Sequence, residues 1–343
     1  MTKSKKKVNV GLLGLGGIAS NHIDAIAGNP EHFELKAVCD KNEVILQDFN
    51  KDISVYSDYE LMLQDDSLDL ISICTPSGMH SSQSIMAAEK NLHVITEKPM
   101  AIELSQAVEM IEAFKESNTK LFVVKQNRLN KFIKLLKEVI SKDVLGKIHL
   151  VQSNVFWTRP QEYYDKEKWR GTREHDGGAL MNQASHYVDL LYWLFGPVES
   201  LNAITSTTRD IETEDTGVLN LKFQSGALGS MNYTMLTYPK NYEGSIMIIA
   251  EKGTIKIGGN SLKFIEAWDL QDSSYDSRVR GLNALEEDMK SDGHKEYYRN
   301  VAEVLNNNTQ PICDGQDGIK SLEILAATYK SSETASTVYL NKG

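Results

Sequence analysis

The sequence predicts an α/β protein of two domains. Residues 1–125 are expected to form a doubly wound parallel sheet, and residues 126–343 an α+β domain with an open, mainly antiparallel sheet. Two observations predict this class. Apolar runs alternate with helical segments in the first third of the chain, as in parallel strands joined by crossover helices. Beyond residue 126, strand-like runs are separated by tight-turn signals, which indicates hairpins.

The length and composition exclude several classes of protein. The 343 residues exceed one ordinary core and fit two domains. A content of 41% hydrophobic and 24% charged residues is typical of a globular protein. The sequence contains no run of about 18 uncharged apolar residues, so it does not predict a membrane span. A net charge of -10 argues against a general nucleic-acid binder. We therefore expect neither nucleic acid nor a membrane as partner.

The cysteines are few and far apart, and no compact C-x-x-C or H-E-x-x-H spacing occurs. We expect buried free thiols in a reducing compartment, the cytoplasm, and no metal site. The three residues concerned are Cys39, Cys74 and Cys313.

The stretch KKKVNVGLLGLGGIASNH has two interpretations. A basic start and a short apolar run resemble a secretory signal peptide, but four glycines interrupt the run, and each costs a helix about 1 kcal/mol. The alternative is a dinucleotide-binding loop of a Rossmann domain. The motif G-x-G-x-x-[G/A] lies between a strand expected at residues 8–13 and a helix expected at residues 19–27. Its members are Gly14, Gly16, Gly17, Ile18 and Ala19.

An acidic residue supports the second interpretation. Asp40 follows an expected strand at residues 34–38 and stands 21 residues beyond Ala19 (40 minus 19). Such an acid binds the adenosine ribose and repels a 2′-phosphate, so NAD is preferred over NADP. Further strands are expected in LDLISICTP, LHVITEKP and KLFVVKQ. Because ligands lie at the carboxyl ends of these strands, we expect cofactor contacts there from Thr75, Pro76, His80, Glu97 and Lys98.

Lys98 is a candidate acid or base at one of these strand ends. Its ordinary pKa of about 10.4 has to fall by roughly 2 to 3 units to act near neutrality, and burial beside a cationic nicotinamide lowers it. The alternative is a solvated lysine at the end of a strand.

In the second domain, strands are expected in IHLVQSNVFWT, ESLNAITSTT, GVLNLKFQSGALGSMNYTML and GSIMIIAEKGTIKIGG, after a helix in RLNKFIKLLKEVI. A helix in GGALMNQASHYVDLLYWLFGP interrupts them. Asn182, His186, Asp189 and Trp193 form a polar stripe on it, opposite an apolar face, so His186 could face a cleft as a titratable group and Asn182 could orient a sugar hydroxyl. The alternative is a stripe that faces water.

The segment FWTRPQEYYDKEKWRGTREHDGG is dense in aromatic residues and arginines. A guanidinium group can donate two parallel hydrogen bonds to the oxygens of a phosphate or carboxylate, and an aromatic ring can stack on a base. The alternative is a surface loop. The residues concerned are Trp157, Arg159, Tyr163, Tyr164, Trp169, Arg170 and Arg173.

The loop GLGGIA, the motifs CTPSGMH and EKPMA, and the histidine helix together resemble the Gfo/Idh/MocA family of oxidoreductases over the whole chain. The resemblance implies an NAD(P)-binding Rossmann domain and an open sheet that forms the substrate site and, commonly, the interface of a homodimer or homotetramer. KQNR, YDKEKWRGT and MNQASHYVD are similar to the branch that oxidises the 3-hydroxyl of UDP-N-acetylglucosaminuronate or UDP-N-acetylglucosamine in cell-surface polysaccharide biosynthesis.

The resemblance also implies site residues. Lys98 and His186 are the catalytic candidates, and either can be the base. Substrate contacts are expected from Lys98, Asn127, Arg159, Tyr164, Trp169, Arg170, Asn182, Gln183 and His186. Two alternatives stay open: a dehydrogenase of a free polyol or hexose such as myo-inositol, which the arginine and aromatic cluster disfavours, and a non-catalytic NAD-binding sensor, which needs neither Lys98 nor His186.

Overall fold

The computed structural model describes residues 7–49, 52–284 and 293–340. The chain divides into two compact units. The first unit comprises residues 7–126 and 293–319, and the second comprises residues 127–284 and 320–340.

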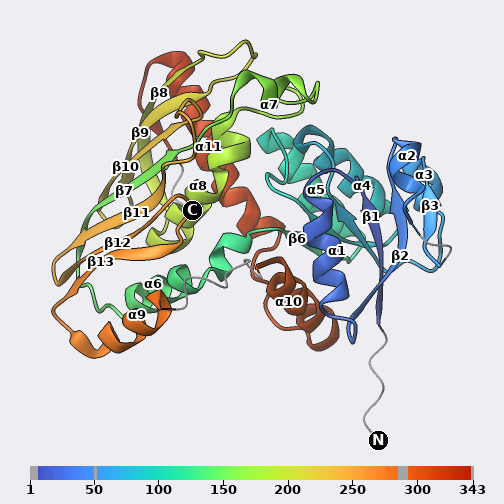
Figure 1. Cartoon of the computed structure of the whole chain (residues 1–343), viewed down its shortest axis with the longest axis horizontal. Helices are drawn as coiled ribbons and strands as arrows, with labels where there is room; N and C mark the ends of the chain where they lie inside the picture. The colour runs from blue at the N-terminus through green and yellow to red at the C-terminus, as the bar shows by residue number, and fades with distance from the viewer. Residues whose placement is uncertain (1–6, 50–51, 285–292, 341–343) are drawn as a thin grey trace, which may run out of the picture. The chain divides into compact units, whose positions relative to one another are not determined.

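The first unit contains a six-stranded sheet in the order β3-β2-β1-β4-β5-β6 (Figure 1). All its strand pairs are parallel, which confirms the doubly wound sheet. The order reverses between β1 and β4, and ligands of such sheets lie outside the carboxyl ends at this point. The strands are β1 Val8–Leu13, β2 Phe33–Cys39, β3 Ser54–Tyr56, β4 Leu70–Ile73, β5 His93–Thr96 and β6 Leu121–Val123.

Helices connect these strands, and the core of the unit lies between them and the sheet. Val10, Leu12, Ile71 and Val94 in the central strands are fully buried, because a parallel sheet is covered on both faces. The helices of this unit are α1 Ala19–Ala27, α2 Glu43–Leu46, α3 Tyr59–Met62, α4 His80–Glu89, α5 Leu104–Glu116 and α10 Gly293–Asn307, with a 3₁₀ turn η1 at Ser77–Met79.

Helix α10 corrects the expected domain boundary. The sequence predicts that everything beyond residue 125 belongs to the second domain, whereas α10 lies beside α1 in the first unit (Figure 1). Two contacts explain why the chain returns to the first unit at α10. Tyr297 donates a hydrogen bond to the Val123 carbonyl at 2.7 Å, and the centre of the Tyr298 ring lies 5.3 Å from that of the Phe33 ring. These contacts fill a face of the first unit that α1 alone leaves uncovered.

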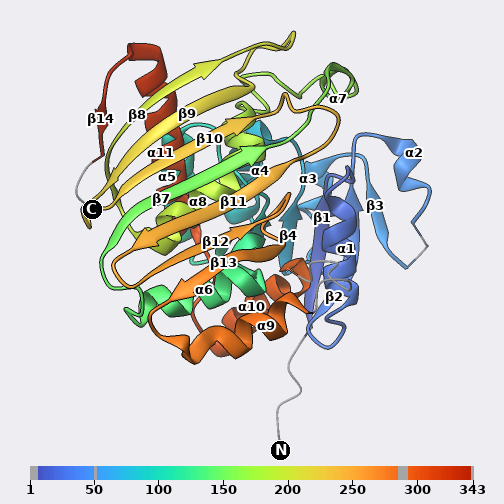
Figure 2. The same ribbon diagram turned by 60° about the vertical axis from the view of Figure 1, so that its left-hand side comes forward.

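The second unit contains an eight-stranded sheet in the order β13-β12-β11-β7-β10-β9-β8-β14 (Figure 2). Its pairs are antiparallel except for β10 with β7, which confirms an open, mainly antiparallel sheet. The strands are β7 Ile148–Phe156, β8 Val198–Ser206, β9 Thr216–Phe223, β10 Leu228–Thr234, β11 Glu243–Ala250, β12 Gly253–Gly258, β13 Phe264–Leu270 and β14 Val338–Tyr339.

The helices of this unit cover one face of the sheet (Figure 2). The opposite face carries exposed apolar side chains, and two pairs of them are cross-strand neighbours: Ile204 with Val218, and Leu228 with Leu150. The helical elements are η2 Gln126–Leu129, α6 Lys131–Ser141, α7 Gln161–Asp165, the π turn η3 Leu180–Ala184, α8 Ser185–Phe195, η4 Ser273–Tyr275, α9 Asp276–Asn283 and α11 Gly315–Thr334, which begins in the first unit.

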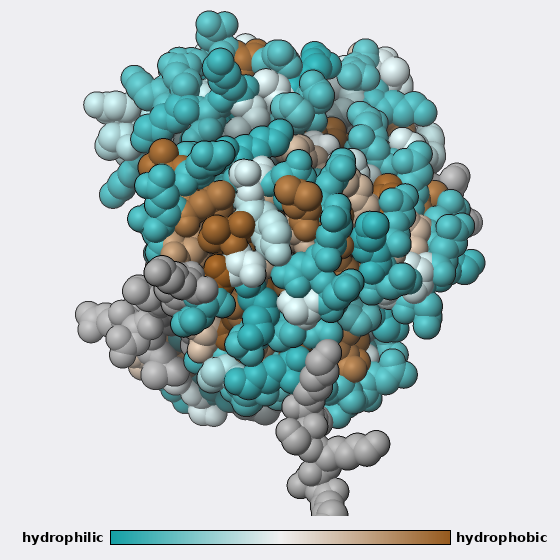
Figure 3. All heavy atoms as spheres, turned by 90° about the vertical axis from the view of Figure 1, so that its right-hand side faces the viewer, coloured by the Kyte–Doolittle hydropathy of each residue, from teal (hydrophilic) through white to brown (hydrophobic). Residues whose placement is uncertain are grey.

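The surface seen in Figure 3 is mainly hydrophilic, with small separate hydrophobic areas. Among the described residues, no helix combines the length and the hydropathy that crossing a membrane requires. The three cysteines are buried and free, as the sequence predicts.

Candidate functional site

The loop after β1 brings two strand ends of the first unit together. Gly14 has a φ of +86°, and a Cβ atom there would lie 2.9 Å from the backbone of Cys74 and Thr75 at the end of β4. Only glycine allows this approach. The positive φ therefore places the loop directly over the point where the strand order reverses.

The next two glycines leave space at the start of α1. Gly16 and Gly17 are exposed, and a Cβ atom on either would have no neighbour within 4 Å. Helix α1 begins at Ala19, and the residue before it, Ile18, provides no side-chain cap. Backbone N–H groups at an uncapped helix start favour an anion, so the loop fits the pyrophosphate of a dinucleotide.

Asp40 follows β2, where the sequence predicts the ribose contact. Its Oδ2 accepts a hydrogen bond from the Leu15 amide at 2.7 Å, and its Oδ1 accepts one from the Asn42 amide at 2.8 Å. The first of these ties the carboxylate to the glycine loop. Because each carboxylate oxygen has two lone pairs, both oxygens can still accept a ribose hydroxyl.

The segment after β4 is fixed by His80 rather than left open. Nδ1 of this buried ring lies 2.7 Å from the carbonyl oxygen of Pro99, and Nε2 lies 2.8 Å from that of Thr75. Both oxygens are acceptors, so the neutral ring donates to one of them at a time. Burial lowers the pKa of His80, against the effect of these two carbonyls. His80 thus joins the ends of β4 and β5, while Thr75 and Pro76 are half-buried at the sheet edge.

Glu97 is one of the cofactor contacts expected from the sequence. Its side chain is buried, and its Oε1 accepts hydrogen bonds from His22 Nε2 at 3.1 Å and His294 Nε2 at 3.2 Å. Its Oε2 accepts one from the Lys98 amide at 3.1 Å. The carboxylate therefore binds protein groups on α1 and α10.

Electrostatics keep this buried carboxylate ionised. Burial by itself raises the pKa of Glu97, but hydrogen bonds from the two histidines hold it well below its ordinary range. Tyr298 donates to Ser72 Oγ at 3.0 Å, and Ser72 Oγ lies 2.9 Å from His22 Nδ1. The hydroxyls satisfy the second imidazole nitrogen, so burial can keep His22 neutral, and its pKa is lowered.

The same three side chains are the one group in the described part of the chain with the donor types of a metal site. The ligand atoms of His22, Glu97 and His294 lie within 4.8 Å of one another. Hydrogen bonds account for each contact, and the hydroxyls of Ser72 and Tyr298 complete the network. The arrangement is that of a hydrogen-bonded buried anion.

Lys98 follows Glu97 at the carboxyl end of β5 and is half-buried. This is the edge of the sheet on which the glycine loop and Asp40 also lie, because parallel strands end on one side. The first unit thus brings together the predicted cofactor residues and one of the two catalytic candidates.

In the second unit, the histidine helix is not a continuous α-helix. A π turn at Leu180–Ala184 precedes α8, which begins at Ser185. Asn182, Gln183 and His186 are half-buried, and the apolar face lies in the core, as expected. A π turn inserts an extra residue into the helical repeat, and such turns are frequent at functional sites.

Asp189 corrects the expected polar stripe. It is 2% exposed, and it accepts hydrogen bonds from Arg128 Nε at 2.8 Å and from Arg128 Nη2 at 2.7 Å. Arg128 is equally buried, and its guanidinium lies 5.5 Å from the ring centre of Trp193. Asp189 therefore belongs to a buried ion pair that fixes α8 to η2. A partner 61 residues away gives no local signal.

The arginine and aromatic segment is ordered by contacts with the π turn. Arg159 donates from Nε and Nη2 to Gln183 Oε1 at 3.0 and 2.7 Å, and Gln183 Nε2 donates to the Tyr163 hydroxyl at 3.0 Å. Arg170 stacks over the Tyr163 ring at 4.1 Å and donates to its carbonyl at 2.8 Å. These contacts bring the guanidinium groups of Arg159 and Arg170 together around the ring of Tyr163.

The remaining candidates lie around this cluster. Asn182 Nδ2 donates to Asp176, a buried carboxylate that also accepts from the Gly171 amide at 2.9 Å. Tyr164 is buried, and burial raises its pKa. Trp169 and Asn127 are half-buried, and Arg173 is exposed.

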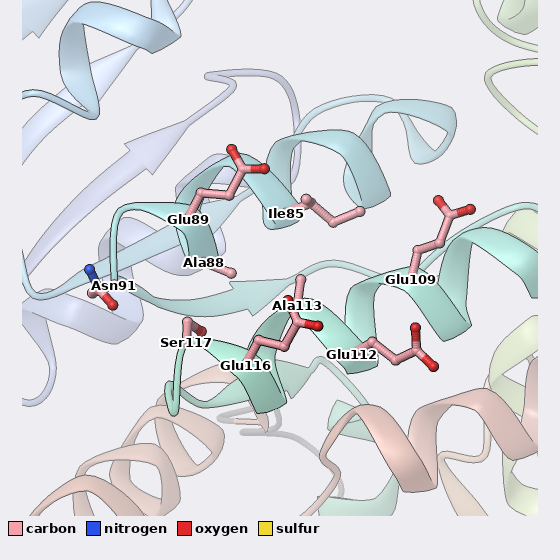
Figure 4. Close-up of a pocket in the computed structure, with 9 residues that line it drawn as sticks. All are labelled: Ile85, Ala88, Glu89, Asn91, Glu109, Glu112, Ala113, Glu116 and Ser117. Carbon is pink, nitrogen blue, oxygen red and sulfur yellow. The ribbon is translucent and has the colours of Figure 1, made fainter.

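A hollow of about 500 Å³ lies elsewhere in the first unit, between α4 and α5 (Figure 4). None of the predicted site residues lines it. Four glutamates do, Glu89, Glu109, Glu112 and Glu116, and their charge opposes an anionic cofactor or a nucleotide sugar. The predicted site residues lie instead at the carboxyl ends of the parallel strands and around the π turn.

Two family models match the chain. The chain matches the family described as "Oxidoreductase family, NAD-binding Rossmann fold" over residues 8–125. It matches "Oxidoreductase family, C-terminal alpha/beta domain" over residues 137–340.

Solved structures and curated proteins add relatives. The WlbA dehydrogenase from Bordetella pertussis, in complex with NADH and UDP-GlcNAcA, is 44% identical, with 99% of each chain covered and a TM-score of 0.95. The corresponding complex from Chromobacterium violaceum is 43% identical, with 99% of this chain and 98% of that chain covered and a TM-score of 0.92. Myo-inositol 2-dehydrogenase of Thermotoga maritima is 26% identical, covering 98% of this chain and 99% of the relative.

Proposed function

Because the chain belongs to the Gfo/Idh/MocA family and is an NAD-dependent oxidoreductase, we propose that it oxidises the 3-hydroxyl of a UDP-linked N-acetylamino sugar to a ketone. UDP-N-acetylglucosaminuronate is the favoured substrate, and UDP-N-acetylglucosamine is the second candidate. The cluster of Arg159, Gln183, Tyr163 and Arg170 carries this proposal, because paired guanidinium groups beside aromatic rings suit a nucleotide diphosphate. Two relatives that are 43–44% identical hold UDP-GlcNAcA.

Different residues of the chain bind the cofactor, orient the sugar and accept the proton. The amides at the start of α1 bind the pyrophosphate of the cofactor, and Asp40 binds its adenosine ribose. NAD⁺, when bound, accepts the hydride that leaves C3 of the sugar. Lys98 or His186 takes the proton of the 3-hydroxyl, so that the loss of a proton and a hydride yields the ketone. Asn182 and Gln183 orient the sugar.

Single-turnover absorbance of NADH tests the proposal. Purified protein and NAD⁺ are mixed with UDP-N-acetylglucosaminuronate, UDP-N-acetylglucosamine or free myo-inositol. We expect NADH with a UDP sugar, and the difference between the first two substrates shows whether the 6-carboxylate is required. NADH with myo-inositol alone would refute the proposal and favour a polyol dehydrogenase, which the relative from Thermotoga maritima supports. Tight NAD⁺ binding without any turnover would favour a sensor.

The position of Asp40 predicts the choice of cofactor. In the Asp40→Asn variant, the side chain keeps an oxygen for the Leu15 amide but loses the charge that repels a 2′-phosphate. We expect the ratio of kcat/KM for NAD⁺ to that for NADP⁺ to fall by about 10-fold or more, since juxtaposed like charges cost several kcal/mol. Steady-state kinetics with both cofactors measure it. Asp24→Asn, an exposed change of the same charge on α1, is the control. An unchanged ratio in Asp40→Asn would remove Asp40 from the ribose site.

The open sheet face predicts self-association. We propose a homodimer or homotetramer in which a second copy covers the exposed pairs Ile204–Val218 and Leu228–Leu150, because exposed apolar patches of this kind mark interfaces. The double variant Ile204→Lys, Val218→Lys is expected to halve the mass measured by light scattering. Val44→Lys, at an exposed position in the first unit, is the control. A mass that stays constant in the double variant contradicts this interface.

We place the reaction in the cytoplasm, where free thiols such as Cys39, Cys74 and Cys313 stay reduced.

A further inference from the structure

A buried carboxylate meets the first residue of the π turn. Glu214 lies in the loop between β8 and β9, and its side chain is buried. Its Oε1 accepts three hydrogen bonds: from the Leu180 amide at 2.8 Å, the Tyr329 hydroxyl at 3.1 Å and the Tyr233 hydroxyl at 3.2 Å. Three donors on one oxygen create an environment suited to an anion.

The Glu214 carboxylate also accepts a hydrogen bond from an amide at the start of the helix. The π turn has no side-chain cap of its own, yet the first amides of a helix have no partner within it. Glu214 accepts from Leu180, and the Tyr329 hydroxyl accepts from the Met181 amide at 3.2 Å. Side chains from the β8–β9 loop and from α11 therefore replace a local cap. A negative charge at this end of a helix is favourable.

The backbone just before the π turn leaves space for the Glu214 carboxylate. Gly178 has a φ of +116°, and a Cβ atom there would overlap Glu214 Oε2 and lie 2.8 Å from the Tyr329 hydroxyl. Only glycine fits both the backbone conformation and the space. The approach of the chain to the turn is thus matched to the position of Glu214.

We propose that Glu214 is a positioning residue that sets the register of the π turn and thereby places Asn182, Gln183 and His186 for the substrate. The inference rests on the proposed function for its substrate. Its geometric basis is the set of hydrogen bonds that Glu214 and Tyr329 make to the first two amides of the turn. The three placed residues follow within the next few positions, so a shift of register moves all of them together.

The charge of Glu214 changes in a range that activity assays cover. Burial raises the pKa of Glu214 from 4.5 to about 7, against the effect of its hydrogen bonds. The titratable groups around it are Tyr233 and Tyr329, whose pKa values burial raises well above 10, and the neighbouring buried Asp215. Because the folded state binds this proton more tightly than the unfolded state, the contribution of Glu214 to stability falls as pH rises from 4.5 to about 7.

The test compares Glu214→Leu, which removes the acceptor of the Leu180 amide, with Glu212→Leu, a control at an exposed position in the same loop. We expect Glu214→Leu to lower kcat by up to about 100-fold, since a displacement of about 1 Å costs that much, with the KM for NAD⁺ unchanged. The component of the pH profile near 7 should disappear, and stability should depend less on pH between 4.5 and 7. Glu212→Leu should leave all four quantities unchanged.

A substrate-free readout separates this inference from the proposed function. The imidazole NMR signals of His186, assigned by their loss in His186→Gln, should shift in Glu214→Leu whatever the substrate is. Wild-type inactivity with UDP sugars would refute the function alone. Unchanged His186 signals and an unchanged kcat in a folded Glu214→Leu protein would overturn the positioning role. If that variant does not fold, Tyr329→Phe, which removes the acceptor of the Met181 amide, decides by the same signals.

Discussion

The Lys98→Met variant is expected to lose about 10²- to 10⁴-fold in turnover, the usual contribution of a general base or acid. The His186→Asn variant should show a loss of the same order. Lys98 lies at the carboxyl end of β5 with its amide bound to Glu97, and His186 lies in the first turn of α8 after the π turn. Single-turnover NADH formation with the UDP sugar measures both variants.

The pH profile then identifies the base. A base has to be deprotonated to act, so its loss removes the rise of kcat with increasing pH, whereas the loss of an orienting group lowers the profile without changing its shape. Lys90→Met and His149→Asn change exposed residues of the same types and serve as controls. Near-normal turnover in both Lys98→Met and His186→Asn would refute the catalytic assignment.

The Asp189→Asn variant is expected to lose about 3–5 kcal/mol of unfolding free energy, because it leaves Arg128 charged and buried without its carboxylate. Both residues are 2% exposed, and two hydrogen bonds of 2.8 and 2.7 Å join them. Urea denaturation followed by circular dichroism measures the change.

Two comparisons distinguish a buried ion pair from a general effect of charge. Glu199→Gln breaks the exposed ion pair with Lys222 and should cost less than about 1 kcal/mol. The double variant Arg128→Met, Asp189→Leu removes both buried charges and should be more stable than Asp189→Asn. A loss below about 1 kcal/mol in Asp189→Asn would show that the pair does not hold α8 in place.

Local patterns allowed much of the fold to be predicted. The expected first strand and first helix agree with β1 and α1, because alternating apolar runs and the glycine loop are signals within one short segment. The family resemblance and the parallel sheet are confirmed as well. What the sequence could not show were pairings over long distances, such as His294 with Glu97, 197 residues apart.

The candidate site was predictable to a similar extent. Arg159 and Arg170 were singled out by residue type and Gln183 by the family resemblance, and the structure brings them together around Tyr163. A π turn and an α-helix share nearly the same apolar pattern, so the break at Ser185 was not foreseen. Glu214 was missed because no motif contains it. Asp210, Glu212 and Asp215 lie in the same loop, and nothing in the sequence distinguishes its buried acids from its exposed ones.

The return of α10 to the first unit has a consequence for biosynthesis. The cofactor-binding unit is not continuous in the chain, since α10 supplies His294 and Tyr298 to the buried network around Glu97. A nascent chain that has left the ribosome only as far as residue 284 contains Glu97 and His22 but neither of their partners from α10. The amino-terminal unit therefore cannot complete its core before strands β7 to β13 of the second unit have been synthesised, and a fragment ending at residue 126 would leave that side of α1 uncovered.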